Sequence, residues 1–522
     1  MERKPPSPPT ALTAAPSLEA MSFDHPSFDH SSFSLKFLGT QSFETLHHDD
    51  QKQECEVDWD GPSDPSNPKN WKTTARMLQV LPIAFFALNM NLAATMFAPG
   101  VDELVAEFGI TNSTVATMTL SIYVLGFGMG MVIAPLSELY GRLWLYHVSN
   151  AVWLAFTIGC AFATNTPSFM IFRFLAGCAG SVPMTCGGGT VADIIPPKDR
   201  GKFMALWGLG PLIGPVVGPI AGGFMSQTVG WRWTFRLLAI LGGISLVGGL
   251  LVLRETHEAT LLKRKATRLR LLTGNNSYTV ASRVNKTAGL TPLQFVARAL
   301  LRPAKMLLFS PIVLCASLYN AVVFGLMFLL FDTFPQVFEQ TYDFSPGTQG
   351  LAYLGFGFGT LLSMAITTKY SDRLMRRRSD DDDDGTKARP ELRLKLMMYF
   401  SPAIPAGFFW YGWSAEGRAH WVVPILGTFV IGFGSLFVML TTQIYLVDVF
   451  DAQAAASALS AALITRILFG TFLPFAATPL YERLGLGWGN SLLGFLVLGL
   501  SPVPFVFYRF GGWLRERFPV RL

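Results

Sequence analysis

Residues 134–144 of the chain read Ala134-Pro-Leu-Ser-Glu138-Leu-Tyr-Gly141-Arg142-Leu-Trp144. This stretch joins two apolar segments, 115–136 and 144–163, each of about twenty residues, the length with which a helix crosses ~30 Å of hydrocarbon. A tight turn that carries an acid and a base at such a boundary is typical of a gate, because its charge pairs can form in one conformation and break in another. A turn that only sets the orientation of the two segments is the alternative interpretation.

Apolar segments of this length recur along the chain. Of its 522 residues, 50% are hydrophobic and only 15% are charged, and the mean hydropathy is +0.37. Soluble domains carry about 25% charged residues. The sequence therefore predicts an all-α integral membrane protein with about twelve transmembrane helices in two six-helix bundles. The expected spans are 77–98, 115–136, 144–163, 169–191, 203–225, 234–253, 306–330, 350–368, 394–413, 421–446, 455–478 and 489–509.

The segments outside these spans predict the domain organisation. Residues 1–75 are rich in Ser, Pro, His and Asp and are expected to form a disordered cytoplasmic tail. A six-helix bundle at 76–253 and another at 306–510 flank a long basic loop at 254–305, and 511–522 form a cytoplasmic C-terminal tail. Because loops rich in Lys and Arg stay on the cytoplasmic side, both termini are predicted to be cytoplasmic.

The net charge of +6 follows from this topology, so we expect a lipid bilayer and no nucleic acid as the partner. Asn112-Ser-Thr lies on the predicted outer side and is an acceptor triplet for N-glycosylation. A plasma-membrane location is expected, with the vacuolar membrane as the alternative. The predicted outer loops between the first and second spans and between the seventh and eighth spans hold acids without Lys or Arg, namely Asp102, Glu103, Glu107, Asp332, Glu339 and Asp343.

The stretch 134–144 resembles the loop motif of the major facilitator superfamily, which reads Gly-x-Leu-x-Asp-x-x-Gly-Arg followed by Arg or Lys. Glu138 stands at the acidic position, and Gly141 and Arg142 match. Ala134 and Leu143 depart from the motif, so the family's charge relay is present but thinned. The resemblance implies that Glu138, Gly141 and Arg142 form part of a gate.

Arg173 lies inside the span 169–191, in Arg173-Phe-Leu-Ala-Gly177. A charge within a span is costly, so this side chain is expected to face a partner or a water-filled cavity. Snorkelling to the outer headgroups is the alternative. The superfamily carries an Arg four residues before a Gly here, and the resemblance implies a role for Arg173 in proton coupling.

Glycines recur every four residues in the span 203–225, at 210, 214, 218 and 222, and place a bare groove on one face of a helix. The stretch resembles the superfamily's antiporter signature, Gly-x-x-x-Gly-Pro-x-x-Gly, which marks exporters. The positions that match are Gly210, Gly214, Pro215 and Gly218. A generic small-residue packing face is the alternative.

Further stretches resemble the twelve-span drug:proton antiporter branch (DHA1 type) as it occurs in fungi, whose members export drugs and secondary metabolites. Examples are Asn67-Pro-Lys-Asn-Trp71, Gly230-Trp-Arg-Trp233 and Tyr445-Leu-Val-Asp448, and the resemblance covers 67 to about 510. Arg466 is the deepest charge in the second half and needs a partner or water, and Asp448 is one candidate partner. Arg466 and Asp448 are therefore further candidates for gating or coupling.

In this fold the transport pathway lies between the two halves, near the first, fourth, seventh and tenth spans. No Asp or Glu falls within the predicted hydrocarbon portions of these four spans, so a neutral amphipathic or anionic substrate is favoured. Polar and large apolar side chains of these spans are candidate cavity residues: Asn89, Asn91, Met184, Tyr319, Asn320, Phe324, Phe433, Phe437 and Gln443.

The sequence thus predicts a monomeric transporter that exports a small organic compound, either a xenobiotic or a secondary metabolite, by alternating access and in exchange for protons. A proton-driven or facilitative importer of a nutrient and a non-transporting membrane sensor are the alternatives. Enzyme motifs such as Gly-x-Ser-x-Gly and His-Glu-x-x-His are absent from the sequence. We expect no metal and no cofactor, with the proton gradient as the energy source.

Overall fold

The computed structural model describes residues 55–196, 199–280, 291–379, 390–450 and 452–518. The described part of the chain is helical apart from two short strands. The first half holds α1 Thr73–Thr95, α2 Val101–Phe108, α3 Ser113–Phe127, α4 Gly130–Tyr140, α5 Arg142–Ala161, α6 Thr166–Gly180, α7 Val182–Ile194, α8 Arg200–Val229 and α9 Arg232–Val252. The second half holds α12 Pro311–Tyr342, α13 Pro346–Leu351, α14 Tyr353–Ser379, α15 Leu394–Phe400, α16 Ala403–Glu416, α17 Val422–Val449, α18 Ala452–Phe472, α19 Ala477–Leu500 and α20 Val503–Arg517.

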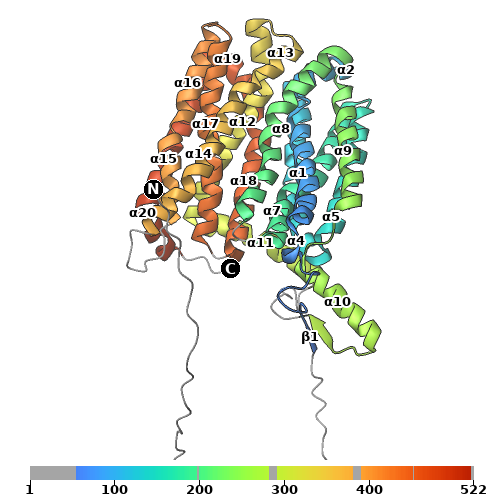
Figure 1. Cartoon of the computed structure of the whole chain (residues 1–522). Helices are drawn as coiled ribbons and strands as arrows, with labels where there is room; N and C mark the ends of the chain where they lie inside the picture. The colour runs from blue at the N-terminus through green and yellow to red at the C-terminus, as the bar shows by residue number, and fades with distance from the viewer. Residues whose placement is uncertain (1–54, 197–198, 281–290, 380–389, 451, 519–522) are drawn as a thin grey trace, which may run out of the picture. The chain divides into compact units, whose positions relative to one another are not determined.

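Each half has its own hydrophobic core. One cluster of buried side chains draws on residues between Ile83 and Leu238, and another on residues between Met306 and Phe507. The long helices of both halves run side by side (Figure 1), with α2 and α13 at one end and α10 (Glu258–Thr273) at the other. We call these the α2 end and the α10 end.

By length and composition, nine helical stretches of the described residues are able to cross a membrane. The last of them, Ala454–Arg517, spans 64 residues and contains most of α18 together with α19 and α20, so it covers two of the expected spans. The expected spans 144–163 and 394–413 form α5 and α15 with α16, and these are not among the nine. The all-helical membrane fold is thus confirmed, whereas the count of twelve is not.

Several expected spans are broken into two helices, and proline accounts for most of the breaks. The fourth span divides at Ser181, just before Pro183, the ninth at Ser401-Pro402 and the last at Ser501-Pro502. Proline has no N–H for the helical ladder and is best accommodated in the first turn of a new helix. Within α19, Gly485 has φ 72° and ψ 179°, a conformation that favours glycine, and the chain turns there between the last two expected spans.

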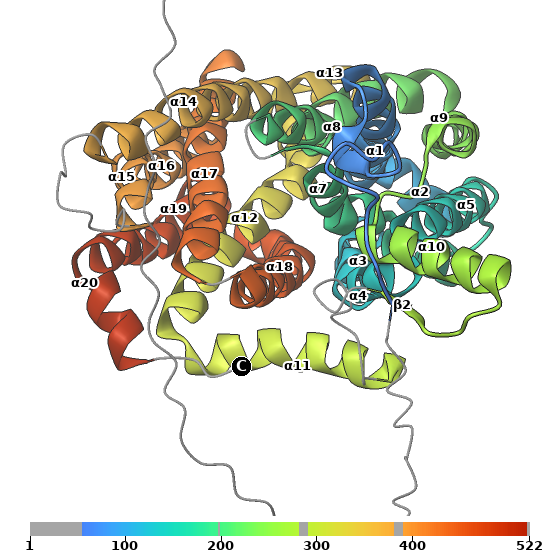
Figure 2. The same cartoon turned by 60° about the horizontal axis from the view of Figure 1, so that its bottom comes forward.

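The α10 end holds ordered structure that the sequence did not predict. Strand β1 (Cys55–Val57) pairs in parallel with β2 (Tyr278–Val280), so residues 55–75 depart from the expected disordered tail, while residues 1–54 lie outside the described part. The expected loop 254–305 contains α10, β2 and most of α11 (Pro292–Phe309). Helix α11 runs across this end (Figure 2) and contacts α4 of one half and α18 of the other.

Candidate functional site

The glycine row of α8 receives helix α1. A Cβ added at Gly210 would lie 2.8 Å from the backbone nitrogen of Leu88, and one at Gly214 would lie 2.5 Å from the Cβ of Asn91. At Gly222 the added Cβ would be 1.7 Å from the carbonyl oxygen of Met96. Only glycine therefore allows the two backbones to approach this closely.

The same helix also contacts the second half of the chain. A Cβ at Gly223 would lie 2.2 Å from the carbonyl oxygen of Pro346, which begins α13. The side-chain oxygen of Gln227 accepts hydrogen bonds from Ser345 (3.2 Å) and from the backbone N–H of Gly347 (3.0 Å). Helix α8 thus lies between the two halves and holds them together at the α2 end.

Arg173 of α6 is buried inside the first half, with 1% of its surface exposed. Its guanidinium donates to the carbonyl oxygen of Ala93 in α1 (2.8 Å) and, over 3.4 Å, to that of Thr119 in α3. The group also lies 4.7 Å from the ring centroid of Tyr123, a favourable cation–π distance. The side chain therefore does not snorkel to the headgroups in this conformation but ties three helices together.

Arg466 of α18 lies deep in the second half and packs against an aromatic ring. Its guanidinium carbon is 4.9 Å from the ring centroid of Phe324 in α12. Within the described part of the chain, its Nε atom is buried without a hydrogen-bond partner. The Asp448 carboxylate forms an ion pair with Arg393 instead. The structure therefore does not bring together the pair that the sequence analysis considered.

The expected gate residues lie at the α10 end, where Arg142 opens α5. Its Nε atom donates to the carboxylate of Asp193 at the end of α7 over 2.5 Å. Glu138 is exposed and lies outside this pair. The acid that faces the turn is Glu255, which accepts hydrogen bonds from the backbone N–H groups of Arg142 (3.1 Å) and Leu143 (3.3 Å).

Glu255 thus satisfies the unpaired N–H groups at the start of α5, where a negative charge also favours the helix dipole. Gly141 has φ 97°, and a Cβ there would lie 2.4 Å from a carboxylate oxygen of Glu255, so the motif glycine makes room for this acid. Beside it, burial and the Arg142 guanidinium lower the pKa of His257 to about 4. At neutral pH this histidine is therefore uncharged.

The sequence analysis did not assign Asp193 and Glu255 to the site. Both acids stand in stretches that resemble the antiporter branch, Asp193-Ile-Ile-Pro-Pro and Arg254-Glu-Thr256. This resemblance was the one feature of the sequence that could have pointed to them. Their distance from Arg142 along the chain hid the contact. The loop motif at 134–144 therefore works with two acids from other segments.

We expect Glu255→Ala to lower the thermal stability of the detergent-solubilised protein. The substitution leaves four backbone N–H groups without their acceptor, those of Arg142, Leu143, Thr256 and His257. Each buried donor left unpaired costs about 1–3 kcal/mol. A fluorescence-detected melting curve measures the effect. Glu138→Ala in the same turn is the control and should leave the melting temperature unchanged; equal losses in the two variants would contradict the assignment.

The candidate cavity residues fall into two groups. In the first half, Asn91 donates a hydrogen bond to the sulfur of Met184 over 3.5 Å. In the second half, Phe324 makes a cation–π contact with Arg466. Other members pack within their own half. Asn89 donates a hydrogen bond to a carbonyl oxygen of α9, and the ring of Phe437 stacks on that of Phe400 with ring centroids 4.4 Å apart. Of the remaining candidates, two are buried, Tyr319 and Asn320, and two are half-buried, Phe433 and Gln443.

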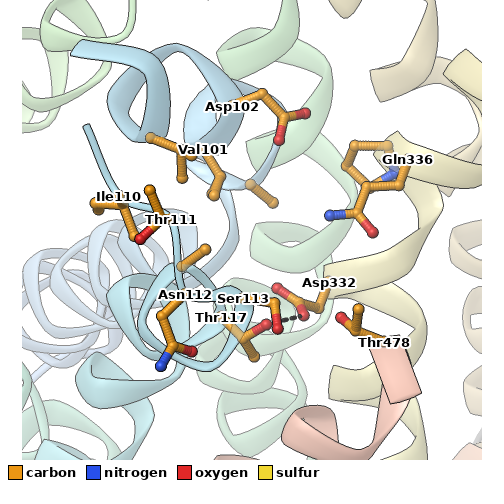
Figure 3. Close-up of a pocket in the computed structure, with 14 residues that line it drawn as sticks. Val101, Asp102, Ile110, Thr111, Asn112, Ser113, Thr117, Asp332, Gln336 and Thr478 are labelled. Atoms are coloured by element: carbon orange, nitrogen blue, oxygen red, sulfur yellow. Dashed lines mark hydrogen bonds between the residues drawn. The ribbon is translucent and has the colours of Figure 1, made fainter. Parts of the chain in front are cut away.

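A cavity of about 220 Å³ lies at the α2 end, and residues of both halves line it (Figure 3). Asp332 of α12 faces it and accepts a hydrogen bond from the hydroxyl of Thr117 in α3 over 3.1 Å. Asp102, Asn112 and Gln336 line the same cavity and are exposed to solvent.

The sequence analysis placed Asp332 in an outer loop, and this was wrong. Helix α12 continues to Tyr342, and the candidate membrane span covers its whole length, Pro311–Tyr342. The helix passes Pro335 because the carbonyl of Phe331, which the proline cannot bond, accepts the hydroxyl of Tyr353 over 2.5 Å instead. The helix that contains the seventh expected span therefore carries two acids, Asp332 and Glu339, beyond the expected end at 330.

Comparison with known proteins relates this arrangement to a family. Residues 83–466 match the family model described as Major Facilitator Superfamily. The chain is 56% identical over 471 residues to MFS transporter prlG of a fungal species (strain NRRL 50135), covering 90% of this chain and 98% of that protein. It is 51% identical over 467 residues to the Trichosetin biosynthesis cluster MFS transporter of Gibberella fujikuroi, covering 89% and 90% of the two chains.

Solved structures show the same fold. The inward-open conformation of the xylose transporter XylE from E. coli superposes with a TM-score of 0.61 at 14% sequence identity, covering 82% of this chain and 95% of that one. At this level of identity the likeness extends to the fold alone.

Proposed function

Since the chain belongs to the Major Facilitator Superfamily and is a transporter rather than an enzyme, we propose that it exports a small organic compound in exchange for protons. The position of α8 is the observation that carries this proposal. Its antiporter-type glycines seat α1, and its other face holds α13 of the second half. A helix of this kind between the halves suits alternating access, because its glycines allow close packing and its prolines allow bending. The drug:proton antiporter branch is the proposed place of the chain within the family.

We propose that the exported compound is a secondary metabolite. A relative that is 51% identical is named for the trichosetin biosynthesis cluster. A neutral amphipathic or anionic compound is favoured by the side chains that meet in each half, Asn91 with Met184 and Phe324 with Arg466. The half-buried Arg466 carries a positive charge that suits an acceptor group on such a substrate.

We propose that the α10 end faces the cytoplasm of a plasma-membrane protein that acts as a monomer. The segment between the halves carries an excess of Lys and Arg at this end, which the positive-inside rule places in the cytoplasm. The α2 end, with Asn112 as a glycosylation acceptor, then faces outward. Asn112 also caps α3, since its side chain accepts from the N–H of Thr114 over 2.9 Å.

We expect cells that express the chain to retain less of its substrate than matched cells without it, and an ionophore that collapses the proton gradient to abolish this difference. The physical reason is that export against a concentration gradient needs the free energy of proton entry. Trichosetin is the first probe, followed by an untargeted comparison of metabolites inside and outside the two kinds of cell.

The control for this experiment is the matched cells without the chain, measured with and without the ionophore. Efflux that persists in the ionophore would refute proton exchange. Net accumulation of the compound in the expressing cells would instead favour an importer.

A further inference from the structure

The cavity at the α2 end points to a proton-binding site that the gate motifs do not include. We propose that Asp332 binds a proton from the external solution and that this proton allows the α2 end to close. The inference rests on the proposed function, because it assigns a site to the proton that drives export. Its first support is position: Asp332 lies on α12 and contacts Thr117 on α3, so the contact spans the two halves.

Closure at this end is visible in the structure. Besides the Thr117–Asp332 hydrogen bond, Gln227 of α8 accepts from Ser345 and Gly347 of the second half. These contacts join the two halves at the α2 end. Asp332 is consequently half-buried between them, while the exposed Asp102 and Gln336 keep the cavity in contact with water.

The surroundings of Asp332 disfavour its charged form when the halves are closed. Among the described residues that line the cavity there is no Lys, Arg or His. Two titratable groups face Asp332. Asp102 from α2 carries a like charge, and the hydroxyl of Tyr353 from α14 donates a hydrogen bond to the carbonyl oxygen of Phe331. Glu339, on the same helix, adds a further negative charge beside Asp102. An unpaired carboxylate enclosed in this way is costly, and a proton removes the cost.

The physical cycle at this end then has two states. With the halves apart, water surrounds Asp332 and its carboxylate is stable as an anion. A proton from the external water converts the carboxylate to the neutral acid, and the two halves can close around it. The hydroxyl of Thr117 can donate to either form, so the hydrogen bond positions the side chain and the proton decides whether closure is favourable.

A distance measurement across the α2 end tests the proposal without a substrate. Spin labels at Ala106 in α2 and Gln340 in α12, both exposed positions outside the cavity lining, report separation by pulsed electron paramagnetic resonance. The sample is the full-length chain in detergent, in a cysteine-free background. As the pH falls from about 8 to about 5, we expect the population with a short distance to grow, because protonation removes the charge that opposes closure.

Three variants distinguish the effect of Asp332 on the pH response from that of its neighbours. Asp332→Asn resembles the protonated acid and should give the short distance at every pH. Asp332→Glu should restore the pH response, and Asp102→Asn, which removes the other acid of the cavity, should retain it. A pH response in Asp332→Asn equal to that of the parent protein, or a parent distance that does not change with pH, would overturn the proposal.

The outcome is independent of the test of export. If the α2 end closes with falling pH through Asp332 but efflux persists in the ionophore, proton exchange fails while the proton-binding site stands. If efflux depends on the proton gradient and Asp332→Asn still responds to pH as the parent does, the coupling site lies elsewhere.

Discussion

We expect the replacement of Arg173 by alanine to stop the proposed export while the protein still reaches its membrane. The guanidinium donates to carbonyl groups of α1 and α3 from α6 and lies over the ring of Tyr123. Alanine removes both hydrogen bonds, and a hydrogen bond from a charged group contributes about 1.5–3 kcal/mol. It also removes the buried positive charge of the first half, which the resemblance to proton-coupled members of the superfamily associates with coupling. Efflux of the probe, normalised to the protein found in the membrane fraction, measures the effect.

Two further variants show what the side chain contributes. Arg173→Lys keeps the positive charge but loses the planar guanidinium, which donates to two carbonyl groups and lies over the ring of Tyr123. We therefore expect export to be strongly reduced in this variant. Arg236→Ala is the matched control, because Arg236 packs on the exposed Trp233 at the edge of the bundle and should be replaceable. Full export by Arg173→Ala would show that the buried guanidinium has no role in transport.

Adding one methyl group at Gly222 will destabilise the protein severely. The Cβ of Gly222→Ala would lie 1.7 Å from the carbonyl oxygen of Met96, and that of Gly214→Ala 2.5 Å from the Cβ of Asn91. Neither neighbour is the far end of a flexible side chain, so α1 and α8 must separate. Overpacking of this kind costs about 1–3 kcal/mol and sometimes more. We expect a lower yield of monodisperse protein and a lower melting temperature, with the larger loss at Gly222.

Gly208→Ala provides the matched control on the same helix. No heavy atom lies within 4 Å of its added Cβ, and alanine favours helix over glycine by about 1 kcal/mol. This variant should therefore melt at the same temperature as the parent protein or slightly above it. A Gly222→Ala protein as stable as Gly208→Ala would mean that α1 and α8 are not packed as described.

The helical membrane fold and the closely packed α8 were predictable because both depend on local patterns. A long apolar segment predicts a span, and glycines four residues apart predict a bare face, whatever the rest of the chain does. For Arg173 the sequence left a partner, a water-filled cavity and snorkelling open, and the fold places the side chain among buried groups. The partners of Arg142 were not predictable, because Asp193 and Glu255 are 51 and 113 residues away in sequence.

Asp332 shows why the end of a helix is harder to predict than its centre. An aspartate followed by Pro335 at the end of an apolar run reads as the start of a loop, and both residues disfavour a continuing helix. The helix continues because Tyr353, on another helix, satisfies the carbonyl that the proline leaves free. A tertiary contact thus overrides the local signal and carries an acid into the region between the halves.

Composition and apolar periodicity along the chain were enough to predict a helical membrane protein, and short motifs were enough to show a resemblance to a known transporter family. These properties depend on neighbours in sequence. The folded chain alone established which polar and charged side chains meet, because each pair joins residues that are far apart in sequence. Arg142 pairs with Asp193 and Asp448 with Arg393, and Thr117 donates a hydrogen bond to Asp332. Pairing at such distances depends on how the helices pack, and a single sequence contains no local signal for it.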